Sequence, residues 1–194
     1  MIEIRIHGRG GQGAVIASKV LACALFAQGQ WVQAFPAFGV ERRGAPVAAF
    51  VRADEAPILL RCQIYQPDQL IVLDPTLIQA VDVTGGLHPG GLILINTQRE
   101  PDSFEGLGAF QVATVDASAI ALRHKLGTPE QPIVNTAILG AYAAVSGVVS
   151  LEAVVQGIEQ SIPSGAAARA NAEASQEAYA AVHPAAAASG RSAS

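Results

Sequence analysis

A glycine-rich turn between a strand-like and a helix-like segment is the feature that most constrains how this chain can fold. Residues 2–6 (IEIRI) alternate apolar and polar side chains with the two-residue period of a β-strand. The turn HGRGGQG follows at 7–13, and residues 14–27 are apolar on nearly every face, as in a helix packed between two layers. A strand, a tight turn and a buried helix in succession predict an α/β fold.

The rest of the chain continues this pattern and then changes. Further strand-like segments lie at 31–35, 46–53, 68–74, 90–96 and 110–116. A short helix is expected at 75–81, and longer helical patterns lie at 118–127, 135–147, 151–162 and 167–182. Strands that alternate with helices and then give way to helices predict a three-layer α/β/α sandwich. We expect its sheet, largely parallel or mixed, to have about six strands.

Length and composition limit the domain organisation and the partners. A chain of 194 residues has the size of one domain, which we expect at 1–182, with a disordered Ala- and Ser-rich tail at 183–194. The net charge of −4 and the scattered Lys and Arg residues give no basic patch for nucleic acid. No secretory signal and no apolar run of about 18 residues are visible. We therefore expect a cytoplasmic protein that binds neither nucleic acid nor membrane.

The chain shows no complete catalytic or metal-binding set in its sequence. Its two cysteines, Cys23 and Cys62, do not form a C-x-x-C pair, and an iron–sulfur cluster usually takes four thiolates. The four histidines are dispersed without the spacing of metal ligands. We therefore expect no metal site and no catalytic residue within this chain.

The glycine turn is a candidate anion site. Gly8, Gly10 and Gly13 satisfy G-x-G-x-x-G between a strand and a helix, where exposed N–H groups and the helix dipole attract an anion. Arg9 adds a positive charge. An NAD site would also need an acidic residue about 20 positions on, yet none occurs between Glu3 and Glu41. The alternative is a turn that only closes the strand onto the helix.

Two other stretches carry candidate functional residues. In FGVERRGAP at 38–46, three consecutive charges stand between glycines; this is either a solvated loop tip or a contact to a phosphate or partner subunit. In the second interpretation Arg42 and Arg43 make the contact and Glu41 orients one of them through an ion pair. The other stretch, PIVNTAILGA at 132–141, places Asn135 where a helix N-cap is expected.

Taken together, four blocks in order resemble the γ subunit, or γ domain, of pyruvate:ferredoxin oxidoreductases. The blocks are HGRGGQG at 7–13, AFPAFGVERRGAPVAAF at 34–50, QIYQPDQLIVLD at 63–74 and PIVNTAILGA at 132–141. The resemblance extends from the N-terminus to about residue 182. A glycine pattern alone is weak evidence, whereas four ordered blocks are fairly specific.

The resemblance implies one chain of a larger enzyme. Such enzymes convert pyruvate and coenzyme A to acetyl-CoA and carbon dioxide and pass electrons to ferredoxin, or run the reverse reaction. Thiamine diphosphate and Mg²⁺ belong to the α and β chains, and 4Fe-4S clusters to the β chain and a ferredoxin-like δ chain. The γ chain helps to bind coenzyme A and to hold the assembly together. The ERRGAPV block is similar to the pyruvate branch rather than to relatives that act on 2-oxoglutarate.

The same resemblance implies that ten residues of this chain contact coenzyme A or a neighbouring subunit. They are Gly8, Arg9, Gly10, Gly11, Gln12, Gly13, Glu41, Arg42, Arg43 and Gly44. Replacing Arg42 and Arg43 by alanine is expected to raise the Michaelis constant for coenzyme A. The alternatives are a γ subunit for another 2-oxoacid such as 2-oxoglutarate, a stand-alone NAD(P)-binding oxidoreductase and a purely structural interaction subunit.

Overall fold

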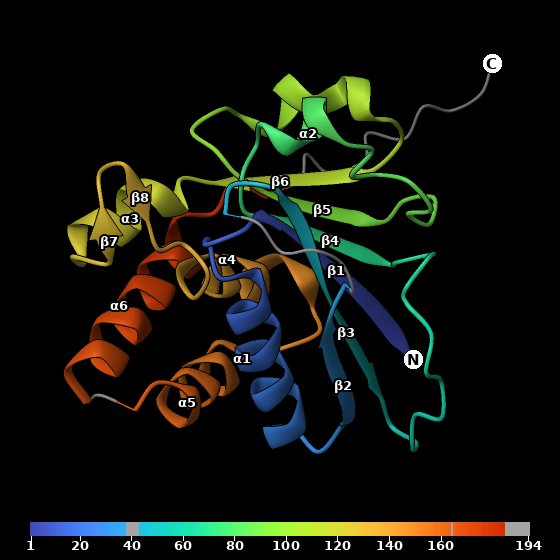
Figure 1. The fold of residues 1–194 in the computed structure, drawn as a ribbon, viewed down its shortest axis with the longest axis horizontal. Coiled ribbons are helices and arrows are strands. Elements are labelled where there is room, and N and C mark those ends of the chain that lie inside the picture. Colours follow the sequence, from blue (N-terminus) through green and yellow to red (C-terminus); the bar gives the residue numbers. More distant parts are fainter. Residues whose placement is uncertain (38–42, 164, 185–194) are drawn as a thin grey trace.

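A six-stranded mixed sheet forms the centre of the protein, seen here in a computed structural model that describes residues 1–37, 43–163 and 165–184 (Figure 1). The strand order is β2-β3-β1-β4-β5-β6. The strands are β1 (Ile2–Arg9), β2 (Trp31–Pro36), β3 (Pro46–Asp54), β4 (Gln69–Val72), β5 (Leu92–Asn96) and β6 (Gln111–Val115). β1, β4, β5 and β6 run parallel, whereas β3 is antiparallel to both of its neighbours. The predicted α/β class and the mixed sheet of six strands are confirmed.

Helices cover the two faces of the sheet unequally (Figure 1). The helical segments are α1 (Ala14–Ala27), α2 (Leu77–Ala80), η1 (Pro101–Leu107), α3 (Ala117–Arg123), α4 (Ala137–Ser146), α5 (Leu151–Ser161) and α6 (Gly165–Ala181). The large core lies between the sheet and α1, α3, α4, α5 and α6. A smaller core on the opposite face lies beneath α2 and η1 and involves only β4, β5 and β6.

Strand β1 shows how the alternating sequence produces this arrangement. Ile4 and Ile6 are fully buried against the helices, and their β3 partners Val51 and Ala49 belong to the same core. The intervening side chains, Glu3, Arg5 and His7, point to the opposite face. Because these side chains are polar, the β1 part of that face adds no residue to the smaller apolar core.

Two close helix contacts depend on glycine. A Cβ atom at Gly140 in α4 would lie 1.8 Å from the Ser175 carbonyl oxygen in α6. A Cβ atom at Gly157 in α5 would lie 2.7 Å from the Val20 carbonyl oxygen in α1. Both distances are far inside van der Waals contact, so these helix pairs approach to a separation that any larger residue would prevent.

The segment between α3 and α4 differs from the sequence-based prediction. A helix was expected at 118–127, but α3 ends at Arg123 and a short hairpin follows, formed by β7 (Gly127–Thr128) and β8 (Gln131–Pro132). Lys125 and Gly127 adopt positive φ angles of 58° and 86°, which end the helical geometry. The 3₁₀ segment η1 was also not predicted, because its sequence PDSFEGL has no long helical period.

The C-terminal part of the described chain returns to the sheet edge. His183 exchanges two backbone hydrogen bonds with Thr114 of β6, at 2.8 and 3.0 Å. We expected the tail to begin at this residue; residues 185–194 lie outside the described part. Among the described helices none is both long and apolar enough to cross a membrane.

Candidate functional site

The glycine turn joins the end of β1 to the start of α1 and is closed by positive φ angles. Gly11 and Gly13 have φ of 100° and 80°, which glycine adopts without steric cost. The Gly10 N–H donates to the Ala45 carbonyl oxygen at 2.9 Å, and the Gly44 N–H donates to the Gly10 carbonyl oxygen at 3.0 Å. The turn is therefore held against the segment that leads into β3, and Gly44 lies beside it.

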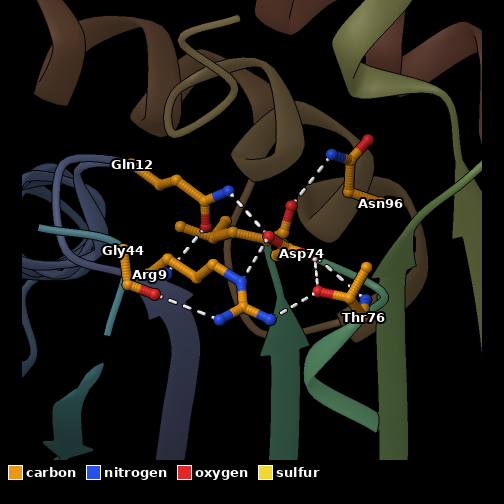
Figure 2. A network of polar contacts seen from close by, with 7 residues as sticks. Arg9, Gln12, Gly44, Asp74, Thr76 and Asn96 are labelled. Carbon is orange, nitrogen blue, oxygen red and sulfur yellow. Dashed lines mark hydrogen bonds and ion pairs between the residues drawn. The ribbon is translucent and has the colours of Figure 1, made fainter. Parts of the chain in front are cut away.

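Arg9 connects three separate segments at this place (Figure 2). Its Nε donates to Asp74 Oδ2 at 3.0 Å, its Nη1 to the Gly44 carbonyl oxygen at 3.0 Å and its Nη2 to Thr76 Oγ1 at 2.7 Å. Each nitrogen of the guanidinium thus has a partner inside the protein. In this arrangement Arg9 fixes the turn to the residues that follow β4, and its charge is paired by Asp74.

The side chain of Gln12 completes the same network (Figure 2). Its Oε1 accepts the Arg9 backbone N–H at 2.7 Å, and its Nε2 donates to Asp74 Oδ2 at 3.1 Å. Asp74 therefore holds both Arg9 and Gln12 through one carboxylate. Sequence analysis missed Asp74, although an acidic residue directly after the buried strand LIVL is a recognisable signal.

The network lies at the carboxyl ends of β1 and β4, where the strand order of the sheet changes direction. β1 and β4 are adjacent and parallel, and the chain leaves β1 toward β2 and β3 on one side and continues from β4 to β5 and β6 on the other. Ligands of open α/β sheets bind outside the carboxyl ends of the strands at such a point. Antiparallel β3 separates β1 from β2, so the adjacent β-α-β unit of a dinucleotide-binding fold is not formed.

Hydrogen bonds stabilise the charged form of Asp74. Burial alone would raise its pKa, but hydrogen bonds from Thr76 and Gln12, together with the positive charge of Arg9, lower the pKa below its usual value. The Thr76 hydroxyl and backbone N–H both donate to Asp74 Oδ1, at 2.6 and 2.9 Å. A carboxylate with a depressed pKa stabilises the fold above its unfolded-state pKa of about 3.9 and loses that contribution as the pH falls through the folded-state value.

Replacing Asp74 by asparagine is therefore expected to lower the free energy of unfolding by about 2 kcal/mol at pH 7. Arg9 would keep its hydrogen bonds to Gly44 and Thr76 but lose the negative charge of Asp74. The Gln12 side chain would then lie against an uncharged amide at position 74. The measurement is urea unfolding of both proteins at pH 7 and pH 3, where the difference should shrink. Asp102, an exposed acidic residue of η1, supplies the matched control Asp102→Asn. Equal stability of D74N and the wild type at pH 7 would contradict the role given to the network.

A cavity of about 460 Å³ opens beside this network. The glycine turn, the Arg43–Gly44 segment and the β7–β8 hairpin line it; the lining residues are Arg9, Gly10, Gly11, Gln12, Arg43, Gly44, Gly127, Thr128, Glu130, Gln131, Pro132 and Ile133. The Arg43 Nη2 donates to Gln131 Oε1 at 2.8 Å, which joins the hairpin to the opposite wall. The hairpin contribution could not be foreseen, because a helix was expected there.

Most of the predicted site residues meet around this cavity. Six of the ten line it directly, while Gly8 in β1 and Gly13 at the N-cap of α1 are neighbours of these residues in the sequence. Glu41 and Arg42 lie outside the described residues. At Gly13 a Cβ atom would lie 2.4 Å from Asn135 Nδ2, so only glycine fits there.

Asn135 itself has a different place from the one predicted. Thr136, not Asn135, is the N-cap residue of α4. The Asn135 side chain is buried against Gly13, and its Oδ1 accepts the Thr136 backbone N–H at 2.9 Å. It therefore contributes to the shape of the turn rather than capping the helix.

The α1 end of the turn offers backbone donors. The N–H groups of a first helical turn have no intrahelical partner, and the N-cap Gly13 provides no side-chain bond to them. Within residues 1–37, 43–163 and 165–184, no three His, Cys, Asp or Glu side chains are grouped as metal ligands. The cavity wall carries two arginines, Arg9 paired with Asp74 and Arg43 bonded to Gln131, and one carboxylate, Glu130.

The mixed sheet defines an α/β chain whose strand order, with antiparallel β3 between β1 and β2, differs from that of dinucleotide-binding folds. Residues 3–181 match the family described as "Pyruvate ferredoxin/flavodoxin oxidoreductase". The chain belongs to that family and is a gamma-type subunit of such an oxidoreductase. The resemblance inferred from the four sequence blocks is confirmed.

Specific relatives agree with this membership. The chain is 53% identical over 182 residues to the pyruvate/ketoisovalerate oxidoreductases common subunit gamma of Thermococcus kodakarensis, covering 92% of this chain and 96% of the relative. The crystal structure of pyruvate oxidoreductase subunit PORC from Thermotoga maritima matches with a TM-score of 0.79 and 38% identity, over 93% and 96% of the two chains.

A third, more distant structure shares the fold alone. It is a 2-oxoglutarate:ferredoxin oxidoreductase from Magnetococcus marinus with 2-oxoglutarate, coenzyme A and succinyl-CoA bound. It has 21% identity and a TM-score of 0.72, over 92% of this chain and 30% of that one. The same fold therefore also occurs as part of a longer chain.

Proposed function

We propose that this chain is the gamma subunit of a coenzyme A-dependent pyruvate:ferredoxin oxidoreductase, or pyruvate synthase. The whole enzyme oxidatively decarboxylates pyruvate to acetyl-CoA and carbon dioxide and passes electrons to ferredoxin, or runs in reverse. Within it, this chain helps to bind coenzyme A at the cavity beside the glycine turn and helps to hold the other chains together.

The cavity is the observation that carries the coenzyme A proposal. Its volume of about 460 Å³ falls in the range of small-molecule sites, roughly 300–1,000 Å³. Coenzyme A carries phosphate groups, and Arg43 at the cavity wall provides donors for phosphate oxygens. Gln131 holds the Arg43 guanidinium at the cavity wall through the 2.8 Å hydrogen bond. The distant relative whose structure contains coenzyme A gives further, weaker support.

The chemistry of the cofactors is assigned to partner chains. Thiamine diphosphate, Mg²⁺ and 4Fe-4S clusters belong to α, β and δ-type subunits in this proposal, and ferredoxin accepts the electrons. Thiamine diphosphate supplies the carbanion chemistry of the reaction. The residues of this chain do not fit a cluster, because it contains two cysteines and such a cluster usually takes four thiolates.

We assign recognition of the 2-oxoacid substrate to the partner chains rather than to this chain. The Thermococcus relative is a subunit common to pyruvate and ketoisovalerate oxidoreductases by its printed name. A shared subunit cannot distinguish two 2-oxoacids, which supports the assignment of substrate recognition to the partner chains. Pyruvate remains the proposed substrate, and a gamma subunit for another 2-oxoacid such as 2-oxoglutarate is the alternative.

Replacing Arg43 by alanine is expected to raise the Michaelis constant for coenzyme A about tenfold. One charge-assisted hydrogen bond to a phosphate contributes about 1.5 kcal/mol, and 1.4 kcal/mol corresponds to a factor of ten. The Michaelis constant for pyruvate should not change, and the complex should stay intact. Steady-state kinetics of the purified complex would measure both constants.

Two further variants make this experiment specific. Gln131→Ala should raise the constant for coenzyme A less than Arg43→Ala, because Arg43 keeps its charge. Arg169→Ala, at an exposed position of α6, is the matched control and should change neither constant. An unchanged Michaelis constant for coenzyme A in R43A would contradict a role of Arg43 in binding coenzyme A. A melting temperature that rises with NADPH but not with coenzyme A would instead favour a dinucleotide site.

A further inference from the structure

One arginine side chain ties a loop to the interior strand β1. Residues 82–86 lie between α2 and β5 in the sequence, and we call them the 82–86 loop. Arg5 points to the face of β1 that the large core does not use. Its Nη2 donates to the Val83 carbonyl oxygen at 2.9 Å and to the Gly85 carbonyl oxygen at 2.7 Å. The position of the loop on the sheet therefore depends on the position of the Arg5 side chain.

His7 holds the Arg5 side chain in this position. The two residues lie on the same face of β1, and the Arg5 Nε donates to the His7 Nε2 at 2.9 Å. The His7 residue is only 9% exposed. An imidazole nitrogen accepts a hydrogen bond only when it carries no proton. This contact therefore requires a neutral His7 with its Nε2 unprotonated.

The surroundings of His7 favour this neutral form. Its neighbours across the sheet, Ala48 of β3 and Val72 of β4, carry no charge. The charged groups that act on it are Arg5 from β1 and Asp82 from the 82–86 loop. Burial, and then the positive charge of Arg5, lower the pKa of His7 to about 4; hydrogen bonding to the loop backbone and the charge of Asp82 oppose this shift but do not cancel it.

We propose that His7 is a pH-sensitive latch, which holds the 82–86 loop on β1 while it is neutral and releases the loop when it takes up a proton. A proton on Nε2 turns the acceptor into a donor that faces the Arg5 Nε, and it brings two positive charges into contact. Arg5 then has to move, and its hydrogen bonds to the loop are lost with it. The latch is a property of the fold and does not depend on the function proposed above.

Other contacts of the loop favour its closed position at neutral pH. Val83 is 2% exposed. A Cβ atom at Gly86 would lie 2.0 Å from the carbonyl oxygen of Tyr65, which belongs to the irregular segment 55–68 between β3 and β4. Release of the loop is therefore a local equilibrium between a closed and an open position, and the proton on His7 shifts it.

The direction of this shift follows from the pKa of His7 in the two positions. In the open position His7 is in contact with water and has its ordinary pKa of about 6.5, whereas in the closed position its pKa is about 4. The closed position is thus fully favoured above about pH 6.5 and loses stability as the pH falls toward 4. Between pH 7.5 and pH 5 the equilibrium constant for opening should rise about 25-fold.

Amide hydrogen exchange of the full chain measures this equilibrium. The Val83 N–H donates to the Val81 carbonyl oxygen and the Leu87 N–H to the Thr84 carbonyl oxygen, each at 2.9 Å. The protection of these two amides, corrected for the intrinsic effect of pH on exchange, should fall about 25-fold from pH 7.5 to pH 5. It should stay below the protection of the β4 amides at both pH values, because the loop opens without the sheet.

Three variants make the measurement specific. His7→Gln keeps a neutral acceptor for Arg5 but does not titrate, so the fall in loop protection with pH should disappear. His88→Gln is the matched control: this histidine follows the loop closely in the sequence, its side chain is 51% exposed, and its loss should leave the fall unchanged. Arg5→Gln removes the tie itself and should lower loop protection already at pH 7.5, with less effect on the β4 amides.

Two results would overturn the latch. The first is a fall in loop protection that is as large in H7Q as in the wild type. The second is loop protection equal to that of the β4 amides at both pH values, since the loop would then open only when the whole chain unfolds. Because neither result involves coenzyme A or a partner chain, the latch can fail while the proposed function stands, and the reverse.

Discussion

Replacing Gly140 by alanine is expected to destabilise the fold by about 3 kcal/mol. A Cβ atom at this position would lie 1.8 Å from the Ser175 carbonyl oxygen and 2.7 Å from the Ser175 Oγ. The carbonyl belongs to the backbone of α6 and cannot turn aside, so α4 and α6 would have to separate. Both helices pack in the large core, and their separation would loosen its contacts.

Urea unfolding of the isolated chain would measure the effect. Gly106→Ala is the matched control, because a Cβ atom there would have no neighbour within 4 Å and its φ is not in the left-handed region. The control should change the free energy of unfolding by less than about 0.5 kcal/mol. A G140A protein as stable as this control would show that the two helices can separate at little cost.

Replacing Arg52 by alanine is expected to cost about 3 kcal/mol as well, for a different reason. The guanidinium is buried, pairs with Glu3 and donates to two carbonyl oxygens of the segment 55–68. It also lies over the Phe35 ring, 5.5 Å from the ring centre. Alanine would leave the Glu3 carboxylate without its partner and release the segment 55–68.

Arg99→Ala serves as the control for this variant. Arg99 also lies over an aromatic ring, that of Phe104 at 4.9 Å, but it is exposed, and its guanidinium donates to the Ser103 carbonyl oxygen. Its loss should cost about 0.5–1 kcal/mol. Urea unfolding measures the stabilities, and limited proteolysis within residues 55–68 should be faster in R52A than in R99A. Equal proteolysis rates would contradict the anchoring role of Arg52.

Elements with a long, clear period were predictable. Helix α1 spans the predicted residues 14–27, and β1 begins at the predicted residue, because each pattern extends over several residues and needs only local geometry. β1 continues to Arg9, beyond the predicted 2–6, because its pairing with β3 extends that far. The hairpin β7–β8 and the segment η1 were not predicted. Each is short, and each depends on contacts with neighbouring elements rather than on a period of its own.

The candidate site was predictable in its location and less so in its contacts. The strand–turn–helix geometry of the glycine turn was predictable, because a glycine cluster between strand and helix leaves few geometries, whereas its contact with Gly44 follows from the pairing of β1 with β3. The partner of Arg9 was not predictable: Asp74 is 65 residues away, and only the pairing of β1 with β4 brings the two together. The place of Gln131 at the cavity has the same explanation, since it depends on the hairpin.

The sequence by itself determined the α/β class, the strand–turn–helix unit at residues 2–27 and the family, because local periodicity and ordered motifs carry that information. Only the tertiary structure decided that Arg9 bonds three segments inside the protein, that a cavity lies between the turn and a hairpin, and that the buried Arg52 holds the segment 55–68. These features depend on which strands become neighbours, and long-range pairing of strands is set by the packing of the whole chain rather than by any local pattern.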